Sequence, residues 1–175
     1  MGFVRFKIVL VGDENVGKSS LVRRFVDNKF TENYIPTLGF QLFLKPLTFR
    51  PYTVELTIWD IAGQPSFEFV RRNYYSHSQG FMLVLDLTKS MADQHLEQWI
   101  AEVHAVCPEV PFILVGNKAD LPEQKVEKGE FDKKSKQLGA AGEVITSAKT
   151  GTNVVNAFDL LGRVYLSALE LKGVI

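Results

Sequence analysis

Apolar-rich runs alternate with amphipathic stretches along the chain. Runs of this length are typical of buried strands, and they predict strands at Phe3–Val11, Phe81–Leu87 and Val110–Val115. Apolar residues at helical spacing, together with one charged stretch, predict helices at Lys18–Val26, Leu96–Val106, Lys125–Leu138 and Val154–Leu169. A short last strand is predicted at Val144–Thr146. This alternation predicts an α/β fold with a mostly parallel sheet.

One part of the chain has a different period. Apolar and polar residues alternate every second position in 40–45 and again in 54–59. Such alternation is typical of strands with one exposed face. The two segments are joined through Pro46–Pro51, so they predict an antiparallel hairpin whose first strand is the antiparallel member of the sheet.

Composition limits the class of protein. The chain has 175 residues, of which 46% are hydrophobic and 23% charged, so we expect one globular domain over residues 1–175. Lys and Arg balance Asp and Glu, which gives no overall basic footprint for nucleic acid. The single cysteine, Cys107, excludes an internal disulfide framework. No apolar run is long enough to cross a bilayer, and a cytoplasmic protein is expected.

The segment Gly12–Ser19 fits the pattern G-x-x-x-x-G-K-[ST] of a phosphate-binding loop. Glycines let the chain turn so that backbone N–H groups point at phosphate, and the following helix adds its positive end. Lys18 would place its charge at the β- and γ-phosphates, and Ser19 would bind Mg²⁺. The nucleotide contacts predicted here are Glu14, Asn15, Val16, Gly17, Lys18, Ser19 and Ser20. The loop alone leaves ATPase, kinase and GTPase open.

Two polar segments that follow predicted strands point to guanine. In Asn117-Lys118-Ala119-Asp120, the Asp120 carboxylate can accept hydrogen bonds from guanine N1–H and N2–H₂, a donor pair that adenine lacks. Lys118 can lie along the purine face, and Asn117 can tie this segment to the phosphate loop. Leu121 follows directly and is also predicted to contact the nucleotide.

The second segment is Ser147-Ala148-Lys149. The backbone N–H of Ala148 could donate to guanine O6, where adenine carries a donor instead. Taken alone, this segment is better explained by a serine that only begins a helix.

Residues at the end of the hairpin are candidates for sensing the γ-phosphate. Asp60 can hold Mg²⁺ through water, the Gly63 N–H can approach the phosphate closely, and Gln64 can orient an attacking water. Gln64 and Lys18 are therefore the predicted catalytic residues.

Three residues before the hairpin complete the predicted site. A Thr37 hydroxyl would complete Mg²⁺ coordination when the γ-phosphate is present. Phe30 could pack against the base, and Tyr34 lies in the same segment.

Together, and in this order, the segments Gly12–Ser19, Thr37, Asp60–Gln64, Asn117–Asp120 and Ser147–Lys149 resemble the small GTPases of the Ras superfamily. Trp59 and the stretches 71–75 and 81–88 are most similar to the Rab branch. The resemblance implies a P-loop domain with a six-stranded sheet and five helices, binding of GTP or GDP with Mg²⁺, and slow hydrolysis of GTP, in membrane trafficking or signalling. It also implies that an exchange factor, a GTPase activator and effectors bind Phe30–Phe40 and Gly63–Tyr75, which respond to the nucleotide.

Three residues depart from the family pattern. Glu14 places a carboxylate where small residues are usual, and Pro65 biases Gln64 toward extended backbone angles. Leu42 replaces an aromatic residue, which leaves Trp59 and Tyr74 as the expected aromatic pair. An alternative function is therefore a GTP-binding scaffold subunit with little or no hydrolysis, and a P-loop ATPase is a third.

Neither end of the chain predicts a direct lipid anchor. No cysteine lies near the C-terminus for prenylation, and Phe6 stands where N-myristoylation requires Ser or Thr. Attachment to membranes is expected only through partners or a tail beyond this chain. Arg71 and Arg72 match no arginine-finger motif and are not expected to reach the nucleotide.

Overall fold

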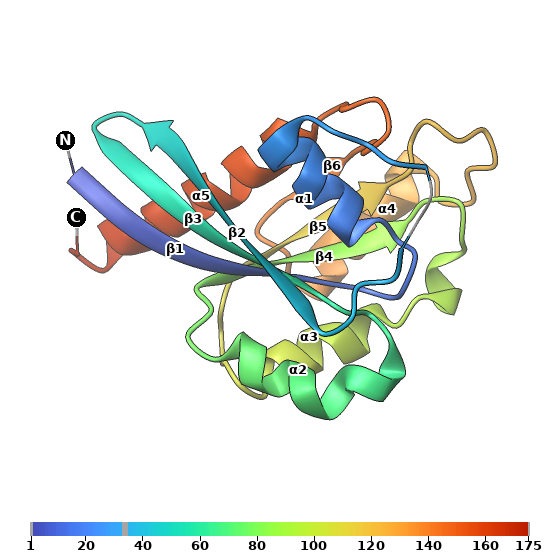
Figure 1. The fold of residues 1–175 in the computed structure, drawn as a ribbon, viewed down its shortest axis with the longest axis horizontal. Coiled ribbons are helices and arrows are strands. Elements are labelled where there is room, and N and C mark those ends of the chain that lie inside the picture. The colour runs from blue at the N-terminus through green and yellow to red at the C-terminus, as the bar shows by residue number, and fades with distance from the viewer. Residues whose placement is uncertain (1, 33–34, 175) are drawn as a thin grey trace.

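The computed structural model describes residues 2–32 and 35–174. Its centre is a six-stranded sheet with the strand order β2-β3-β1-β4-β5-β6 (Figure 1). The strands are β1 (Gly2–Val11), β2 (Phe40–Phe49), β3 (Tyr52–Ile61), β4 (Gly80–Asp86), β5 (Phe112–Asn117) and β6 (Glu143–Ile145). Every pairing is parallel except that of β2 with β3. The predicted α/β fold with one antiparallel strand is confirmed.

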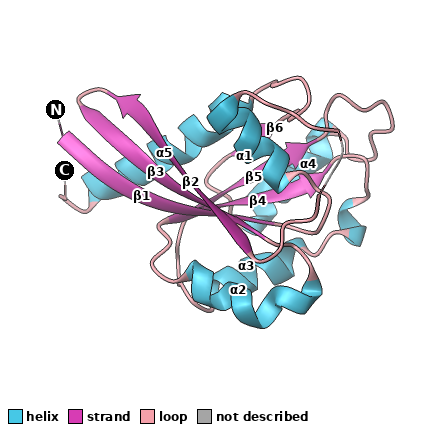
Figure 2. Cartoon of the chain, in the orientation of Figure 1, coloured by secondary structure: helices cyan, strands magenta, loops and turns pink. Residues whose placement is uncertain are grey.

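Four α-helices connect successive strands, and a fifth follows β6 (Figure 2). They are α1 (Lys18–Asp27), α2 (Glu68–Tyr75), α3 (Leu96–His104), α4 (Lys128–Leu138) and α5 (Val154–Leu171). Short 3-10 turns lie at Pro65–Phe67 and Met91–Asp93. Apolar spacing predicted α1, α3 and α5, and a charged stretch predicted α4, whereas α2 was implied only by the family resemblance. No helix in the described part of the chain is long and apolar enough to span a bilayer.

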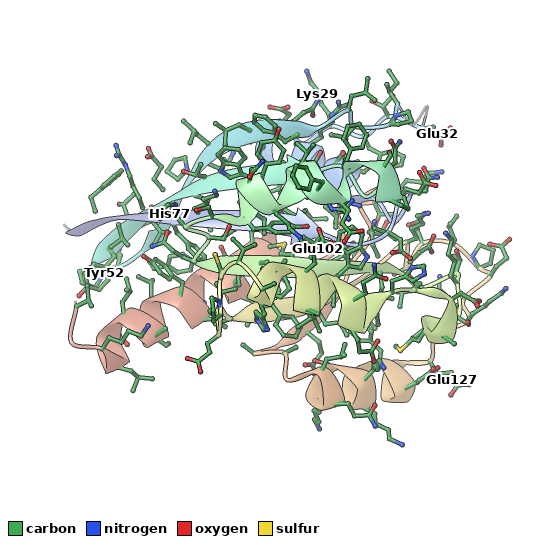
Figure 3. The ribbon with its side chains drawn as sticks, turned by 90° about the horizontal axis from the view of Figure 1, so that it is seen from below. Lys29, Glu32, Tyr52, His77, Glu102 and Glu127 are labelled. Carbon is green, nitrogen blue, oxygen red and sulfur yellow. The ribbon has the colours of Figure 1, made fainter. Side chains whose placement is uncertain are left out.

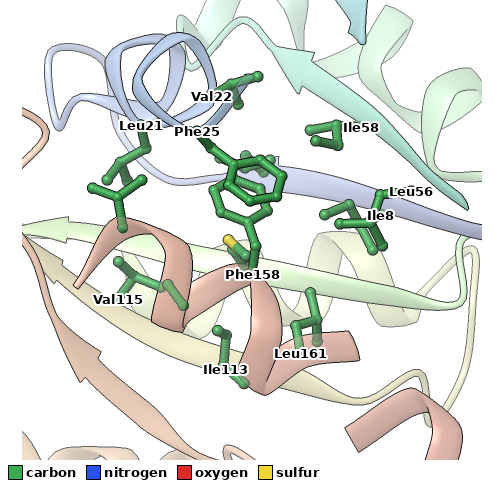
Figure 4. Close-up of a cluster of buried hydrophobic side chains, with 14 of the residues drawn as sticks. Ile8, Leu21, Val22, Phe25, Leu56, Ile58, Ile113, Val115, Phe158 and Leu161 are labelled. Atoms are coloured by element: carbon green, nitrogen blue, oxygen red, sulfur yellow. The ribbon is translucent and has the colours of Figure 1, made fainter. Parts of the chain in front are cut away.

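The helices cover both faces of the sheet, and each face has its own core. Helices α1 and α5 lie on one face, above the sheet in Figure 1, and Figure 4 shows the side chains that they bury there. Phe25 of α1 stacks on Phe158 of α5 with ring centroids 3.9 Å apart. On the other face, Tyr75 of α2, Trp99 of α3 and Phe131 of α4 pack against β4 and β5. Because helices cover both faces of β4 and β5, side chains that point to either face are buried, which explains why these strands are continuously apolar.

The hairpin is longer than predicted. Strand β2 continues through Pro46, which pairs with Glu55 of β3, and the turn is confined to Arg50 and Pro51. The prediction that Pro46–Pro51 forms the connection was therefore wrong. Proline is tolerated because β2 is an edge strand, where a missing N–H removes no bond to a further neighbour.

The parallel strands bring distant loops to one edge of the sheet. Strands β1, β5 and β6 end at Val11, Asn117 and Ile145, and all three run in the same direction. Loops that follow the carboxyl ends of parallel strands meet at that edge, where ligands bind in open α/β sheets. The predicted phosphate and base segments are therefore neighbours in space.

Candidate nucleotide-binding site

The phosphate loop leads from β1 into α1, and Gly17 is the residue that lets it do so. Gly17 has φ 101°, in the left-handed region, and caps the N-terminus of α1. A Cβ atom at this position would lie 2.2 Å from Asn117 Nδ2. Only glycine allows both the backbone angle and this approach. The phosphate loop is thereby packed directly against the predicted base-reading segment.

Lys18 is buried, with 7% of its surface exposed, and its ammonium group lies under the loop. Nζ donates to the carbonyl oxygens of Gly12 at 2.6 Å and Asp13 at 2.7 Å. Burial lowers the pKa of Lys18 to about 8, against the opposing charges of Asp60 and Asp13. A cation held in so little water interacts strongly with an incoming phosphate.

The lowered pKa of Lys18 makes nucleotide binding depend on pH. A bound diphosphate stabilises the ammonium form, so binding raises the pKa and takes up a proton, and affinity falls as pH rises through 8. At pH 8, where the phosphate of free GDP is already almost fully ionised, the protein is expected to take up about half a proton per GDP bound. Calorimetric titration in two buffers of different ionisation enthalpy measures this uptake. No uptake at pH 8 would contradict the buried, depressed lysine.

The base-binding region is a cavity of about 430 Å³ at the edge of the sheet. Most of its lining was predicted, namely Asn15, Gly17, Ser20, Phe30, Asn117, Lys118, Asp120, Leu121, Ala148 and Lys149. Thr31 and Glu32 also line it and were not predicted. A volume of this order is typical of small-molecule pockets. Tyr34, also predicted here, lies outside the described residues.

Asn117 holds three loops together. Its contact with the phosphate loop was predicted, and its contacts with the loop after β6 were not. Its Nδ2 donates to the Val16 carbonyl at 2.9 Å, which joins it to the phosphate loop. Its Oδ1 accepts from the Ala148 N–H at 3.1 Å and from Thr146 Oγ1 at 3.2 Å. The Ala148 N–H predicted for guanine O6 is thus already bonded within the protein, so reading O6 would require it to share that proton.

The side chains of Asp120 and Lys118 are each oriented by a partner. Ser147 Oγ donates to Asp120 Oδ1 at 2.6 Å, which fixes the carboxylate at the cavity. Lys118 Nζ bonds to Asp86 Oδ2 at 2.7 Å, so its aliphatic stem is stretched along the cavity wall. Burial tends to raise the pKa of Asp86, but hydrogen bonds from Lys118 and Thr88 hold it below the usual value. Asp86 stays ionised as the anchor of Lys118.

Arg24 and Glu32 support the loop after β6, and the sequence analysis missed both of them. Arg24 of α1 donates to the carbonyl of Ala148 at 2.9 Å and to that of Lys149 at 2.6 Å. Glu32, which Figure 3 shows at the rim of the molecule, lies 2.9 Å from Lys149 Nζ. Both contacts join α1 or the segment after it to the loop after β6, and no local sequence signal marks them.

Three oxygen-bearing side chains converge beside Lys18 as the predicted magnesium site. Ser19 Oγ lies 2.5 Å from Asp60 Oδ2 and 2.8 Å from Thr37 Oγ1. Asp60 is fully buried, and its Oδ1 has no hydrogen-bond partner among the described residues. Burial raises the pKa of Asp60, although bonds from Ser19 and the charge of Lys18 oppose it. An orphaned carboxylate oxygen beside two hydroxyls fits a hard cation such as Mg²⁺.

Thr37 is expected to matter more for the triphosphate than for the diphosphate. In Thr37→Ala we expect affinity for a non-hydrolysable GTP analogue to fall about 10- to 100-fold, as for the loss of a bond to a charged centre, while GDP affinity stays within about threefold. Thr37→Ser keeps the hydroxyl and is expected to restore the difference. Equal losses for both nucleotides in the alanine variant would remove Thr37 from the sensing role.

Gly63 brings the segment after β3 against the phosphate loop. A Cβ atom on Gly63 would lie 2.6 Å from both the Gly12 carbonyl oxygen and Lys18 Nζ. Gln64 follows in an extended conformation, with φ −71° and ψ 137°, as the proline after it predicted. Glu14 is exposed, so its carboxylate has access to water. The contacts of Gly63 place the backbone that leads into Gln64 beside the loop that holds Lys18.

Comparison with known proteins agrees with this arrangement. The Ras family profile matches residues 7–167 of the chain. The chain is 38% identical over 159 residues to the Ras-related protein Rab-1D of Dictyostelium discoideum, covering 90% of this chain and 78% of that protein. It is 37% identical over the same length, with the same coverage, to the GTP-binding protein ypt1 of Schizosaccharomyces pombe. The chain therefore belongs to the Ras family of small GTPases, which bind GTP or GDP with Mg²⁺ and hydrolyse GTP.

Proposed function

We propose that residues 1–175 form one G domain that acts as a GTP/GDP switch in membrane trafficking or signalling. The observation that carries the proposal is the contact of Thr37 with Ser19 and Asp60. This contact joins a segment outside the phosphate loop to the predicted magnesium site, so that segment can respond to the γ-phosphate.

The chemistry assigned to this site is positioning and charge neutralisation. Lys18 and the backbone N–H groups of the phosphate loop offset the charge of the phosphates, Ser19 and Thr37 would hold Mg²⁺ directly, and Asp60 would hold it through water. Bound Mg²⁺ would supply charge neutralisation at the phosphate oxygens. Gln64 orients the attacking water. Without a partner arginine, hydrolysis is expected to be slow, on the order of 10⁻⁴ s⁻¹.

The proposed partner surface consists of Phe30–Phe40 and Gly63–Tyr75. Phe40 contacts both Trp59 and Tyr74, with ring centroids 5.0 and 4.5 Å apart. The aromatic pair expected from the sequence is therefore a group of three. Exposed apolar side chains lie in or next to the same segments, at Ile35, Leu38, Leu42 and Phe69. An apolar surface of this kind beside the nucleotide suits an exchange factor, a GTPase activator or an effector.

The scaffold alternative rested on Glu14 and Pro65, and the family relationship gives it no support. Glu14 is exposed rather than packed over the loop. We place the protein in the cytoplasm, with peripheral association with membranes. The ATPase alternative conflicts with the Asp120 carboxylate at the base cavity and with membership of a GTPase family.

The test combines the nucleotide that copurifies with the protein and single-turnover hydrolysis. We expect GDP or GTP in the purified protein, ATP to compete at least about 10³-fold more weakly, and Gln64→Leu to slow hydrolysis at least about tenfold. Gln64→Glu, of similar size, controls for packing. Comparable affinity for ATP would end the guanine assignment, and unchanged hydrolysis in Gln64→Leu would remove Gln64 from the mechanism.

A further inference from the structure

Arg71 on α2 is buried, with 3% of its surface exposed, and its guanidinium group is fully occupied by protein. Nε and Nη2 donate to the two carboxylate oxygens of Glu102 on α3 at 2.9 and 3.0 Å. Tyr75 Oη donates to the same carboxylate at 2.8 Å. Figure 3 shows Glu102 between the two helices. The side chain is thus held in one position by a bidentate ion pair out of water.

The remaining nitrogen of Arg71 reaches the segment that faces the phosphate loop. Nη1 donates to the Gln64 carbonyl at 2.6 Å and lies 3.4 Å from that of Ala62. These carbonyls flank Gly63, whose backbone is packed against Gly12 and Lys18. Arg71 therefore clamps the main chain on both sides of Gly63. With every part of its fork engaged in this way, it is not available as an arginine finger.

The helix that anchors Arg71 also contacts the phosphate loop. The Arg71 guanidinium carbon lies 4.4 Å above the ring of Trp99, and Trp99 Nε1 donates to Asp13 Oδ1 at 2.7 Å. The backbone carbonyl of Asp13 in turn accepts from Lys18. Helix α3 consequently holds both the loop that grips the phosphates and, through Arg71, the segment that carries Gln64.

We propose that Arg71 is a positioning residue for GTP hydrolysis, which fixes the main chain of Gly63 and Gln64 relative to the phosphate loop by clamping their carbonyls to α3. The proposal rests on the role of Gln64 given above. Stability alone does not explain the arrangement, because a buried ion pair is seldom more stabilising than apolar residues of the same volume. A geometric role does explain it, because a small misplacement of a reacting group slows catalysis strongly.

The test replaces the clamp without leaving a buried charge unpaired. In Arg71→Met combined with Glu102→Gln, both charges are removed and the glutamine still accepts from Tyr75. We expect single-turnover hydrolysis to fall about 10- to 100-fold while GDP affinity stays within about twofold. Arg71→Lys, which keeps the charge but not the fork, is expected to recover only part of the rate. Thermal melting of each GDP complex verifies folding.

A matched control removes another ion pair. Lys128 and Asp132 form an exposed pair on α4 at 2.6 Å, and Lys128→Met with Asp132→Asn is expected to leave hydrolysis unchanged. The second arm places the Arg71 and Glu102 changes in Gln64→Leu. If Arg71 acts through Gln64, they slow hydrolysis no further in that background.

The outcomes separate the two proposals. A normal or faster rate in the Arg71 and Glu102 variant, with Gln64→Leu slow, overturns the positioning role and leaves the function of Gln64 intact. Additive losses in the triple variant also overturn it, because Arg71 would then act independently of Gln64. A normal rate in Gln64→Leu itself overturns the role of Gln64 first, and the positioning role with it.

Discussion

Replacing Lys18 by methionine is expected to weaken GDP and GTP binding by about 10²–10³-fold, or about 3–4 kcal/mol. The reason is the burial of Nζ beneath the phosphate loop, where Gly12 and Asp13 fix its position. An ammonium group shielded from water offsets phosphate charge far more strongly than an exposed one. Methionine keeps most of the aliphatic length and removes the charge together with the hydrogen bonds that Nζ donates. Equilibrium titration with fluorescent GDP measures the loss.

The same substitution is expected to leave the nucleotide-free protein at least as stable. Burial depresses the pKa of Lys18 from 10.5 to about 8, so keeping it charged at pH 7 costs the folded state about 3 kcal/mol, which methionine removes. The lost bonds to two carbonyls offset part of this gain. At one fixed GDP concentration, the increase in melting temperature should be larger for the wild type than for Lys18→Met, because the weaker binder gains less stability from the same ligand. A variant that binds GDP within threefold of the wild type would contradict the phosphate-loop assignment.

The parts of the site that the sequence predicted are those built from contiguous residues. The phosphate loop is one segment, and its glycines, lysine and serine are spaced by the geometry of a single turn into a helix. Asn117–Asp120 is likewise one segment after a strand, and its neighbours in the cavity follow from the parallel sheet. In such segments the spacing of residue types along the chain is enough to predict how the side chains are arranged in the site.

The residues that sequence analysis missed act through partners far along the chain. Arg24 supports the loop after β6 by donating to Ala148, 124 positions away. Asp86 matters because it anchors Lys118, and Glu102 because it anchors Arg71. A charged residue in a helix more often faces solvent, so its type alone gives no reason to assign it a buried partner. Asp86 and Lys118 meet because strands β4 and β5 are neighbours in the sheet, and the other pairs meet because of how the helices pack.

The length of the hairpin strand β2 was also predicted wrongly, because the sequence does not show that β2 lies at the edge of the sheet. Pro46 looked like the start of a turn because proline cannot donate to a ladder, but an edge strand has one side without a neighbour. Strand β2 runs from Phe40 to Phe49. At its first residue, the Phe40 ring packs on Trp59 and Tyr74. The alternating pattern predicted the strand, whereas its length and its aromatic contacts depended on which neighbours it has.

Replacing Asp120 by asparagine is expected to change the preferred base from guanine to xanthine. The carboxylate can accept from both guanine N1–H and N2–H₂, whereas an amide offers one acceptor and one donor. Xanthine has a carbonyl in place of the guanine amino group, so it matches the amide and not the carboxylate. Ser147 Oγ donates to Asp120 Oδ1 at 2.6 Å, so in the variant it favours the amide oxygen at that position and the NH₂ group at the position of Oδ2.

In this variant GDP affinity is expected to fall by about two to three orders of magnitude, because an amide donor would face the guanine amino group. Xanthosine diphosphate is expected to bind the variant more tightly than GDP does. Competition of both nucleotides against one fluorescent diphosphate measures the two changes together. Adding Ser147→Ala frees the amide to rotate, so part of the selectivity for xanthine should be lost. Equal weakening for both bases would mean that Asp120 supports the cavity without reading the base, and the guanine specificity would then have to reside elsewhere in its lining.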